Sequence, residues 1–202
     1  MPTVALLAAC VAVTSILGAR SVGRGLPGWL DSAFDSRISD VMIRFPALVR
    51  WLPYLGSLGP VTLMTLTLVL TCAVARRWRG AVLAAVAVPA AVGLTEYVLK
   101  PYVGQAIGHS FPSGHATSMF ALATICAVLL VNSPPRASGV LRLLLVCMAL
   151  LLAAAVAAAM VASGAHRFTD AVAGAAVGTG VVLACTLALD LVTREATKEA
   201  LP

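Results

Sequence analysis

The sequence predicts an all-α integral membrane protein, built as a six-transmembrane-helix bundle with an interfacial amphipathic helix between the first and second spans. Two observations lead to this prediction. Of the 202 residues, 60% are hydrophobic and only 11% are charged, whereas a soluble domain carries about 25% charged residues. The polar residues also gather in short stretches that separate long apolar runs, a pattern typical of helices that cross a bilayer.

Six apolar runs have a length suited to crossing a hydrocarbon core about 30 Å thick, which takes about 20 helical residues. Within one integral membrane domain, residues 1–202, the expected spans cover residues 4–19, 60–76, 81–99, 115–132, 139–162 and 170–192. The first run resembles a signal-peptide core in length, but no basic residue precedes it and basic residues follow it, so we interpret it as a span.

Residues 28–50 have a different pattern. Apolar residues recur every four positions, at Leu30, Phe34, Ile38 and Met42, and charged residues lie between them. This spacing predicts one apolar stripe on a helix that lies along the membrane surface. Such a helix would serve as a surface anchor or would guide a lipid tail.

An even number of spans places both termini on the same side of the membrane. The short loop Arg76–Arg79 lies on that side, and short arginine-rich loops stay in the cytoplasm. We therefore expect a protein of a bacterial plasma membrane, with the loops after the third and fifth spans on the outer face. The arginines of the amphipathic segment lie on the outer side and count against this orientation.

The net charge of +6 is explained by these loops and does not indicate nucleic-acid binding, because aromatic residues for base stacking are sparse. The five cysteines all lie in apolar runs without metal-ligand spacing, so we expect them to pack as small apolar residues. The composition thus predicts the membrane bilayer as a partner of this protein. The oligomeric state does not follow from the sequence.

All three histidines lie in two polar stretches, residues 100–115 and 166–170. With six spans, the loops after the third and fifth spans open on the same side, so Lys100, His115 and His166 can converge at one membrane–water boundary. Ionisable residues at membrane depth indicate a functional site.

The two stretches carry complementary chemistry. His166 and Asp170 are four residues apart, so at a helix entrance they share a face and the carboxylate can orient the imidazole. Ser113 and Gly114 stand just ahead of the fourth span, where a hydroxyl and the N–H groups of a helix N-terminus form an anion site. Lys100 adds a positive charge. This set indicates phosphoryl transfer at a membrane surface.

In order and spacing, these residues resemble the type 2 phosphatidic acid phosphatase family of membrane lipid phosphatases. The resemblance rests on Lys100, on Pro112-Ser113-Gly114-His115, and on His166 with Asp170. It implies that His166 attacks phosphorus and forms a phosphohistidine while Asp170 holds its ring. His115 would protonate the leaving oxygen and then activate water.

The resemblance further implies that Lys100, Ser113 and Gly114 hold the phosphate oxygens, and that no metal or other cofactor takes part. Two family arginines are missing, however. Ile107 stands in place of the first arginine and Met160 in place of the second. Neither side chain can replace the planar, bidentate clamp that an arginine forms on phosphate.

Other cations are therefore candidates for the missing arginines. Arg167, beside the expected nucleophile, is the first candidate, and His109 is the second. Arg44 and Arg50 are further candidates.

The predicted function is that of a metal-independent phosphatase of lipid phosphates or pyrophosphates. Its expected partner is a lipid phosphate substrate: a polyprenyl phosphate or pyrophosphate, a phosphorylated polyprenyl-linked sugar, or a phosphatidyl phosphate. The alternative is a degenerate family member that binds or translocates a lipid phosphate without hydrolysis. A small transporter would predict discontinuous helices or an internal repeat, and the sequence shows no clear repeat.

Several of these residues also have structural interpretations. Glu96 precedes Lys100 by four residues, which favours an ion pair on a helix. Asp170 suits the first turn of a helix. Gly174 and Gly178, four residues apart in the sixth span, are expected to permit close helix packing.

Overall fold

The computed structural model describes residues 2–21, 28–104, 111–132 and 138–199, and within these ranges the chain is helical without strands. The helices are α1 (Pro2–Ser21), α2 (Trp29–Met42), α3 (Pro46–Leu55), α4 (Leu58–Val74), α5 (Trp78–Gly93), η1 (Leu94–Gly104), α6 (Gly114–Val131), α7 (Gly139–Ala162) and α8 (Phe168–Glu199). The predicted all-α fold class is confirmed.

The described helices provide five candidate membrane spans, or six if one bent pair counts as a single span. The bent pair is α3 with α4, whose axes differ in direction by 59°. The predicted second span, residues 60–76, corresponds to α4, and α3 continues it at an angle. The number of spans thus agrees with the predicted bundle of six when this pair is counted once.

The amphipathic segment differs from its prediction as a single helix over residues 28–50. It forms two helices: α2 ends at Met42, and α3 begins at Pro46. Pro46 is the first residue of α3 and disfavours the helical conformation at the residue before it. Phe45 accordingly has φ −127° and ψ 65°, and the chain breaks there into two helices.

Two other predicted spans are longer than expected. The third, predicted over residues 81–99, begins at Trp78 and continues beyond α5 as η1, a π-helical segment with the wider i→i+5 turn. The sixth, predicted over residues 170–192, begins at Phe168 and extends to Glu199. The fifth agrees with residues 139–162, and the first and fourth agree to within two residues.

The bundle is held together mainly where α6 and α8 cross. At Gly174 and Gly178, a Cβ atom would collide with the backbone oxygens of Ser113 and Thr117. The predicted role of these glycines in close packing is therefore confirmed. Because lipid tails are as apolar as leucine, membrane helices associate through such close contacts rather than through a hydrophobic effect.

A core of small and branched apolar side chains lies between α4, α5, α6 and α8. Its buried members include Val61, Leu83, Ala87, Ile125 and Val182.

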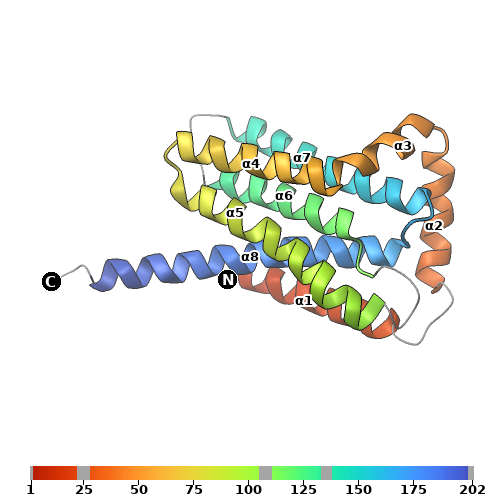
Figure 1. Cartoon of the computed structure of the whole chain (residues 1–202), viewed down its shortest axis with the longest axis horizontal. Helices are drawn as coiled ribbons and strands as arrows, with labels where there is room; N and C mark the ends of the chain where they lie inside the picture. Colours follow the sequence, from red (N-terminus) through yellow and green to blue (C-terminus); the bar gives the residue numbers. More distant parts are fainter. Residues whose placement is uncertain (1, 22–27, 105–110, 133–137, 200–202) are drawn as a thin grey trace.

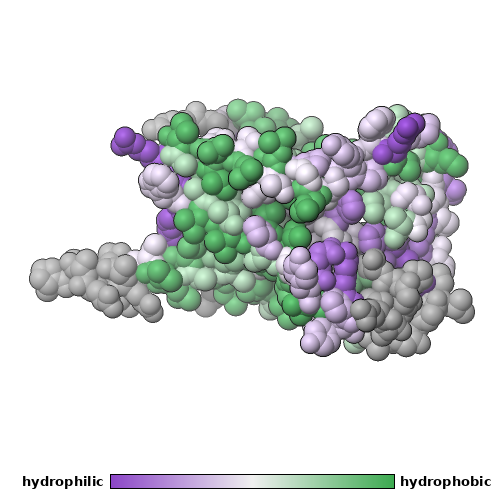
Figure 2. Space-filling view, in the orientation of Figure 1, coloured by the Kyte–Doolittle hydropathy of each residue, from purple (hydrophilic) through white to green (hydrophobic). Residues whose placement is uncertain are grey.

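The elements of the two polar stretches meet at one end of the bundle. In Figure 1, α2 runs across this end, where α6 and α8 begin and η1 finishes. The turn between α4 and α5, with its arginines, lies at the opposite end. Figure 2 shows apolar surface along the helices and polar surface concentrated towards both ends, as expected for helices embedded in a bilayer.

Candidate active site

The two predicted polar stretches are joined directly by a backbone hydrogen bond. The N–H of Ser113 donates to the carbonyl oxygen of Asp170 over 3.0 Å. Ser113 and Asp170 are both buried. The start of α6 and the start of α8 therefore form one site, as the loop arrangement predicted.

The N-terminus of α6 is organised by hydroxyl groups. Ser113 is the N-cap residue, and its hydroxyl accepts a hydrogen bond from the N–H of Ala116. The hydroxyl of Thr117 donates to the Ser113 carbonyl over 3.0 Å, and the Thr95 hydroxyl donates to Thr117 over 3.1 Å. Within the described part of the chain, the N–H groups of Gly114 and His115 have no hydrogen-bond partner. These amides are available to an anion.

Lys100 lies beside these amides and is paired with Glu96. Its Nζ donates to Glu96 Oε1 over 2.5 Å, so the predicted ion pair is present. A Cβ atom at Gly114 would lie 2.5 Å from Glu96 Oε1 and 3.5 Å from Lys100 Nζ. The pair therefore lies directly against Gly114 at the helix N-terminus, and a larger residue there would push the Glu96 carboxylate aside.

His115 is half-buried and faces the turn between α3 and α4. A Cβ atom at Gly56 would lie 2.9 Å from His115 Cδ2, so the imidazole packs on a bare backbone. His115 is also in electrostatic range of His166, Lys100 and Glu96. The sequence alone does not predict this contact, because nothing local shows which side chain Gly56 faces.

The loop that carries His166 is short and well defined. Helix α7 ends at Ala162, and Gly164 follows with φ +73°, a conformation that favours glycine. The N–H of Gly164 donates to the Val161 carbonyl over 2.9 Å, and the N–H groups of Ala165 and His166 donate to the Met160 carbonyl over 3.2 and 3.3 Å. This pattern is a Schellman motif, and it turns the chain directly into His166.

The position of Met160, where the family arginine is expected, is buried. The Met160 side chain is 8% exposed, and its carbonyl anchors the His166 loop. An apolar side chain therefore fills this place. Ile107 and His109 lie outside the described residues.

His166 and Asp170 lie close together, but their side chains are not hydrogen-bonded. The distance from His166 Nδ1 to Asp170 Oδ2 is 3.8 Å, beyond hydrogen-bond range. Among the described residues, buried His166 Nδ1 has no partner. Asp170 Oδ2 instead accepts the N–H of Arg167 over 2.9 Å. The expected carboxylate–imidazole bond is thus replaced by a helix cap, because α8 begins at Phe168 and His166 precedes it.

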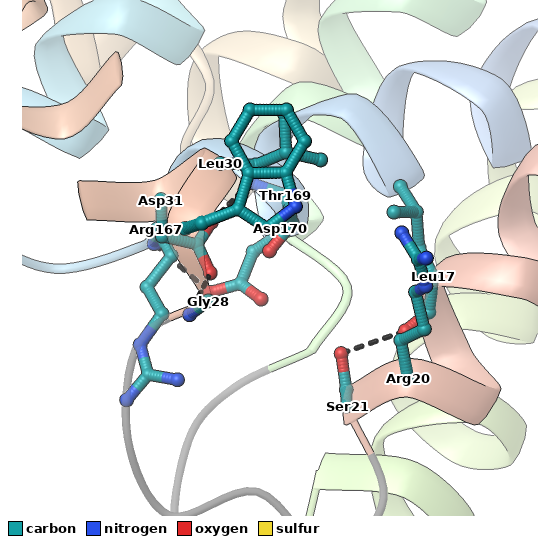
Figure 3. Close-up of a pocket in the computed structure, with 10 residues that line it drawn as sticks. Leu17, Arg20, Ser21, Gly28, Leu30, Asp31, Arg167, Thr169 and Asp170 are labelled. Atoms are coloured by element: carbon teal, nitrogen blue, oxygen red, sulfur yellow. Dashed lines mark hydrogen bonds between the residues drawn. The ribbon is translucent and has the colours of Figure 1, made fainter. Parts of the chain in front are cut away.

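Two further carboxylates reach this helix start from α2. Asp35 accepts the N–H of Phe168 over 2.8 Å, and Asp31 accepts the N–H of Thr169 over 3.0 Å. Sequence reasoning missed both residues. The signal was two aspartates four positions apart beside the apolar stripe of the amphipathic segment, but their partners lie more than 130 residues away. Figure 3 shows Asp31 and Asp170 approaching the start of α8 together.

The pKa of Asp35 is perturbed at this site. Burial raises the pKa of Asp35, and the nearby charges of Asp31 and Asp170 raise it further; the Phe168 N–H and Arg167 act in the opposite direction. Asp35 therefore holds its proton more tightly in the folded protein than in the unfolded chain.

This pKa direction predicts a pH dependence of stability. Between the ordinary aspartate pKa and the raised pKa of Asp35, the folded state binds more protons than the unfolded state, so stability decreases as the pH rises through this window. The substitution Asp35→Asn should flatten that decrease while retaining an oxygen acceptor. Thermal unfolding of both proteins in detergent, from the ordinary aspartate pKa of 3.8 to neutral pH, tests this expectation. Parallel pH profiles would contradict it.

Arg167 lies directly before Phe168, the first residue of α8. It lines a hollow between α1, α2 and α8, together with Arg20, Asp31 and Asp170 (Figure 3). None of Lys100, Ser113, Gly114 and His115 lines this hollow. The structure therefore groups the predicted site residues into a cluster around the α6 N-terminus and His166, with Arg167 beside it.

Comparisons with known proteins bear on this cluster. A family model described as PAP2 superfamily matches residues 94–194, a range that includes η1, α6, α7 and most of α8. No curated protein and no solved structure matches the chain. Among the described residues, no group of three or more His, Cys, Asp or Glu side chains is arranged to hold a metal ion.

Proposed function

This chain belongs to the PAP2 superfamily, and from that membership we propose that it is a metal-independent phosphatase of lipid phosphates or pyrophosphates that acts through a phosphohistidine at His166. Membership supports phosphatase activity on phosphate esters. The observation that carries the finer proposal is the bond between Ser113 and Asp170, which sets an anion-binding helix N-terminus against the loop of an imidazole nucleophile.

The phosphate would bind at the start of α6. There it would accept hydrogen bonds from the N–H groups of Gly114 and His115 at the positive end of the helix dipole. Lys100 would supply a full positive charge. Since Lys100 is paired with Glu96, the ammonium group would share or exchange this partner when phosphate binds.

The reaction would proceed in two displacements. His166 Nε2 attacks phosphorus, the bond to the leaving oxygen breaks, and His115 gives that oxygen a proton. His115 then takes a proton from water, the water oxygen attacks phosphorus, and the bond from phosphorus to His166 breaks. Phosphate is released and both imidazoles return to their starting state.

Asp170 would orient His166 during the first step. A shift of about 1 Å would bring its carboxylate within hydrogen-bond range of His166 Nδ1. Catalytic hydrogen bonds are often long in the free enzyme and shorten when substrate binds. The positive charge that develops on the imidazole would strengthen this bond.

The substrate would be a lipid whose phosphate lies at the membrane surface. The site is at the end of apolar candidate spans, which suits a polyprenyl phosphate or pyrophosphate, a phosphorylated polyprenyl-linked sugar, or a phosphatidyl phosphate. The arginines of the α4–α5 turn lie at the opposite end of the bundle. By the positive-inside rule we place the site on the outer face of a bacterial plasma membrane.

A second candidate function is lipid phosphate binding or translocation without hydrolysis. Two observations favour it. Buried Met160 takes the place of a phosphate-binding arginine, and His166 Nδ1 has no hydrogen-bond partner among the described residues. The close approach of Asp170 to His166 favours the phosphatase, because binding alone does not require an oriented imidazole.

Phosphate release by the purified protein in detergent tests the proposal. The substrates would be the three lipid classes named above, each assayed with a metal chelator and without added metal. We expect release from at least one class, undiminished by the chelator. Binding of a lipid phosphate without any release would instead support the second candidate, and loss of release with chelator would contradict the metal-independent mechanism.

A further inference from the structure

The start of α8 is capped by one carboxylate of its own and by two from another helix. Three successive N–H groups, those of Arg167, Phe168 and Thr169, each donate to a different carboxylate. One carboxylate is the local Asp170, and the other two are Asp31 and Asp35 of α2. Asp31 lies 138 residues before Thr169 in the chain, and Asp35 lies 133 residues before Phe168.

This arrangement is more elaborate than helix capping requires. A single serine, threonine or aspartate at the N-cap normally suffices, and α6 and α7 begin with their own serines, Ser113 and Ser138. At α8 the two α2 carboxylates accept the helix amides instead. Asp31 is only 4% exposed. Burying a charge is costly unless it is well bonded. What the arrangement adds is a fixed position for the residue just before the capped turn, which is His166.

Helix α2 is itself firmly placed against both halves of the site. Ile38 packs against a buried cluster that contains Ala116 of α6 and Ala171 of α8. The ring of Phe34 stacks on that of Phe168, with ring centroids 4.5 Å apart and an interplanar angle of 17°. The carboxylates are therefore presented from a rigid support and not from a loose surface helix.

The α2 carboxylates also leave Asp170 free for His166. Because Asp31 and Asp35 accept two of the three amides, the Asp170 side chain accepts the N–H of Arg167 alone among the described residues, and it lies 3.8 Å from His166 Nδ1. Without them, two partly buried amide donors near Asp170 would lack these acceptors and would compete with the imidazole for its carboxylate.

We propose that Asp31 and Asp35 are positioning residues, through which α2 holds the first turn of α8 and thereby sets His166 and Asp170 in their reactive arrangement. The inference rests on the proposed function for its catalytic readout. The residues touch neither substrate nor the reacting atoms, and they act through hydrogen bonds to the backbone.

The test compares Asp31→Ala, Asp35→Ala and Asp35→Asn with the unaltered protein, each purified in detergent. Asp35→Asn retains an oxygen that can accept the Phe168 N–H. Asp31 is not a clean site for this rescue, because its second oxygen also accepts the N–H of Gly28. Asp40→Ala is the matched control, since Asp40 lies exposed on the same helix.

Two readouts are used. The first is kcat and KM for phosphate release. The alanine variants should lose kcat by on the order of 10- to 100-fold, as expected for a misplacement of about 1 Å, while KM changes by less than about threefold. Asp35→Asn should stay within about twofold of the unaltered protein, and Asp40→Ala should match it.

The second readout does not depend on activity. Diethyl pyrocarbonate modifies accessible imidazoles, and mass spectrometry resolves the three histidines. His166, with 7% of its side chain exposed, should react several-fold faster in the alanine variants and at the original rate in Asp35→Asn. The rate at His115 should not change.

The outcomes separate this inference from the proposed function. Alanine variants with unchanged kcat and unchanged His166 modification overturn the inference, as does an Asp35→Asn protein as impaired as Asp35→Ala. If the unaltered protein releases no phosphate but the predicted His166 modification pattern holds, the proposed function fails and the positioning role stands. If Asp31→Ala does not fold, the comparison of Asp35→Ala with Asp35→Asn decides the question, because Asp35 is only half-buried.

Discussion

Replacing His166 by alanine is expected to reduce phosphate release by on the order of 10³-fold or more, because the first displacement then lacks its nucleophile. The fold should persist. Buried His166 Nδ1 has no hydrogen-bond partner among the described residues, and the loop is held by backbone bonds to the Met160 carbonyl. Phosphate release is measured beside size-exclusion behaviour and thermal unfolding in detergent.

A control in the same loop makes this result specific. Ser163→Ala removes a hydroxyl that donates to the Met160 carbonyl over 2.9 Å, and it should leave kcat within a fewfold of the unaltered protein. If His166→Ala retained most of the activity, the phosphohistidine mechanism would be wrong. If it failed to fold, the residue would be structural and the second candidate function would gain support.

The substitution Gly178→Ala is expected to destabilise the bundle and to inactivate the site together. The added Cβ would collide with the Thr117 carbonyl oxygen and lie 2.9 Å from the N–H nitrogen of Ala121. Both contacts are backbone atoms of α6, so no side chain can move aside. Overpacking of this kind lowers the free energy of unfolding by about 1–3 kcal/mol or more. The collision can be relieved only if α8 moves away from α6.

That separation would weaken the bond between Ser113 and Asp170 that joins the two halves of the site. We therefore expect a lower unfolding temperature and a marked loss of phosphate release, both measured in detergent. Gly59→Ala is the matched control, because a Cβ at Gly59 of α4 meets no atom within 4 Å and alanine favours a helix. An unfolding temperature for Gly178→Ala equal to that of this control would refute the close α6–α8 contact.

The sequence predicts some interactions of the site residues on either side of this contact, but not others. The pairing of Lys100 with Glu96, the place of Ser113 at a helix start and the packing of Gly174 and Gly178 all follow from spacing within one helix or at its end. Each interaction depends on residues within about four positions, or on a general requirement for small residues between membrane helices. The structure shows the ion pair, the helix start and the close packing at the predicted places.

The bond of Asp170 to Arg167, rather than to His166, shows where local reasoning stopped. The spacing of four residues predicted a shared helix face, but it could not show that α7 ends in a Schellman motif at Gly164 and that α8 starts only at Phe168. A shift of two residues in a helix start changes which group a carboxylate meets. Boundaries of this kind depend on the competition between local caps and tertiary contacts.

By itself, the sequence determined the all-α membrane bundle and the residues that carry the candidate chemistry. Apolar runs about as long as a bilayer is thick have few alternatives, because every backbone polar group must be bonded within the membrane. Only the tertiary structure decided that Asp31 and Asp35 cap α8 and that Gly56 receives His115. These contacts join segments that lie far apart in the chain, and their partners are set by how α2, α3 and α8 pack, which no local pattern of residues specifies.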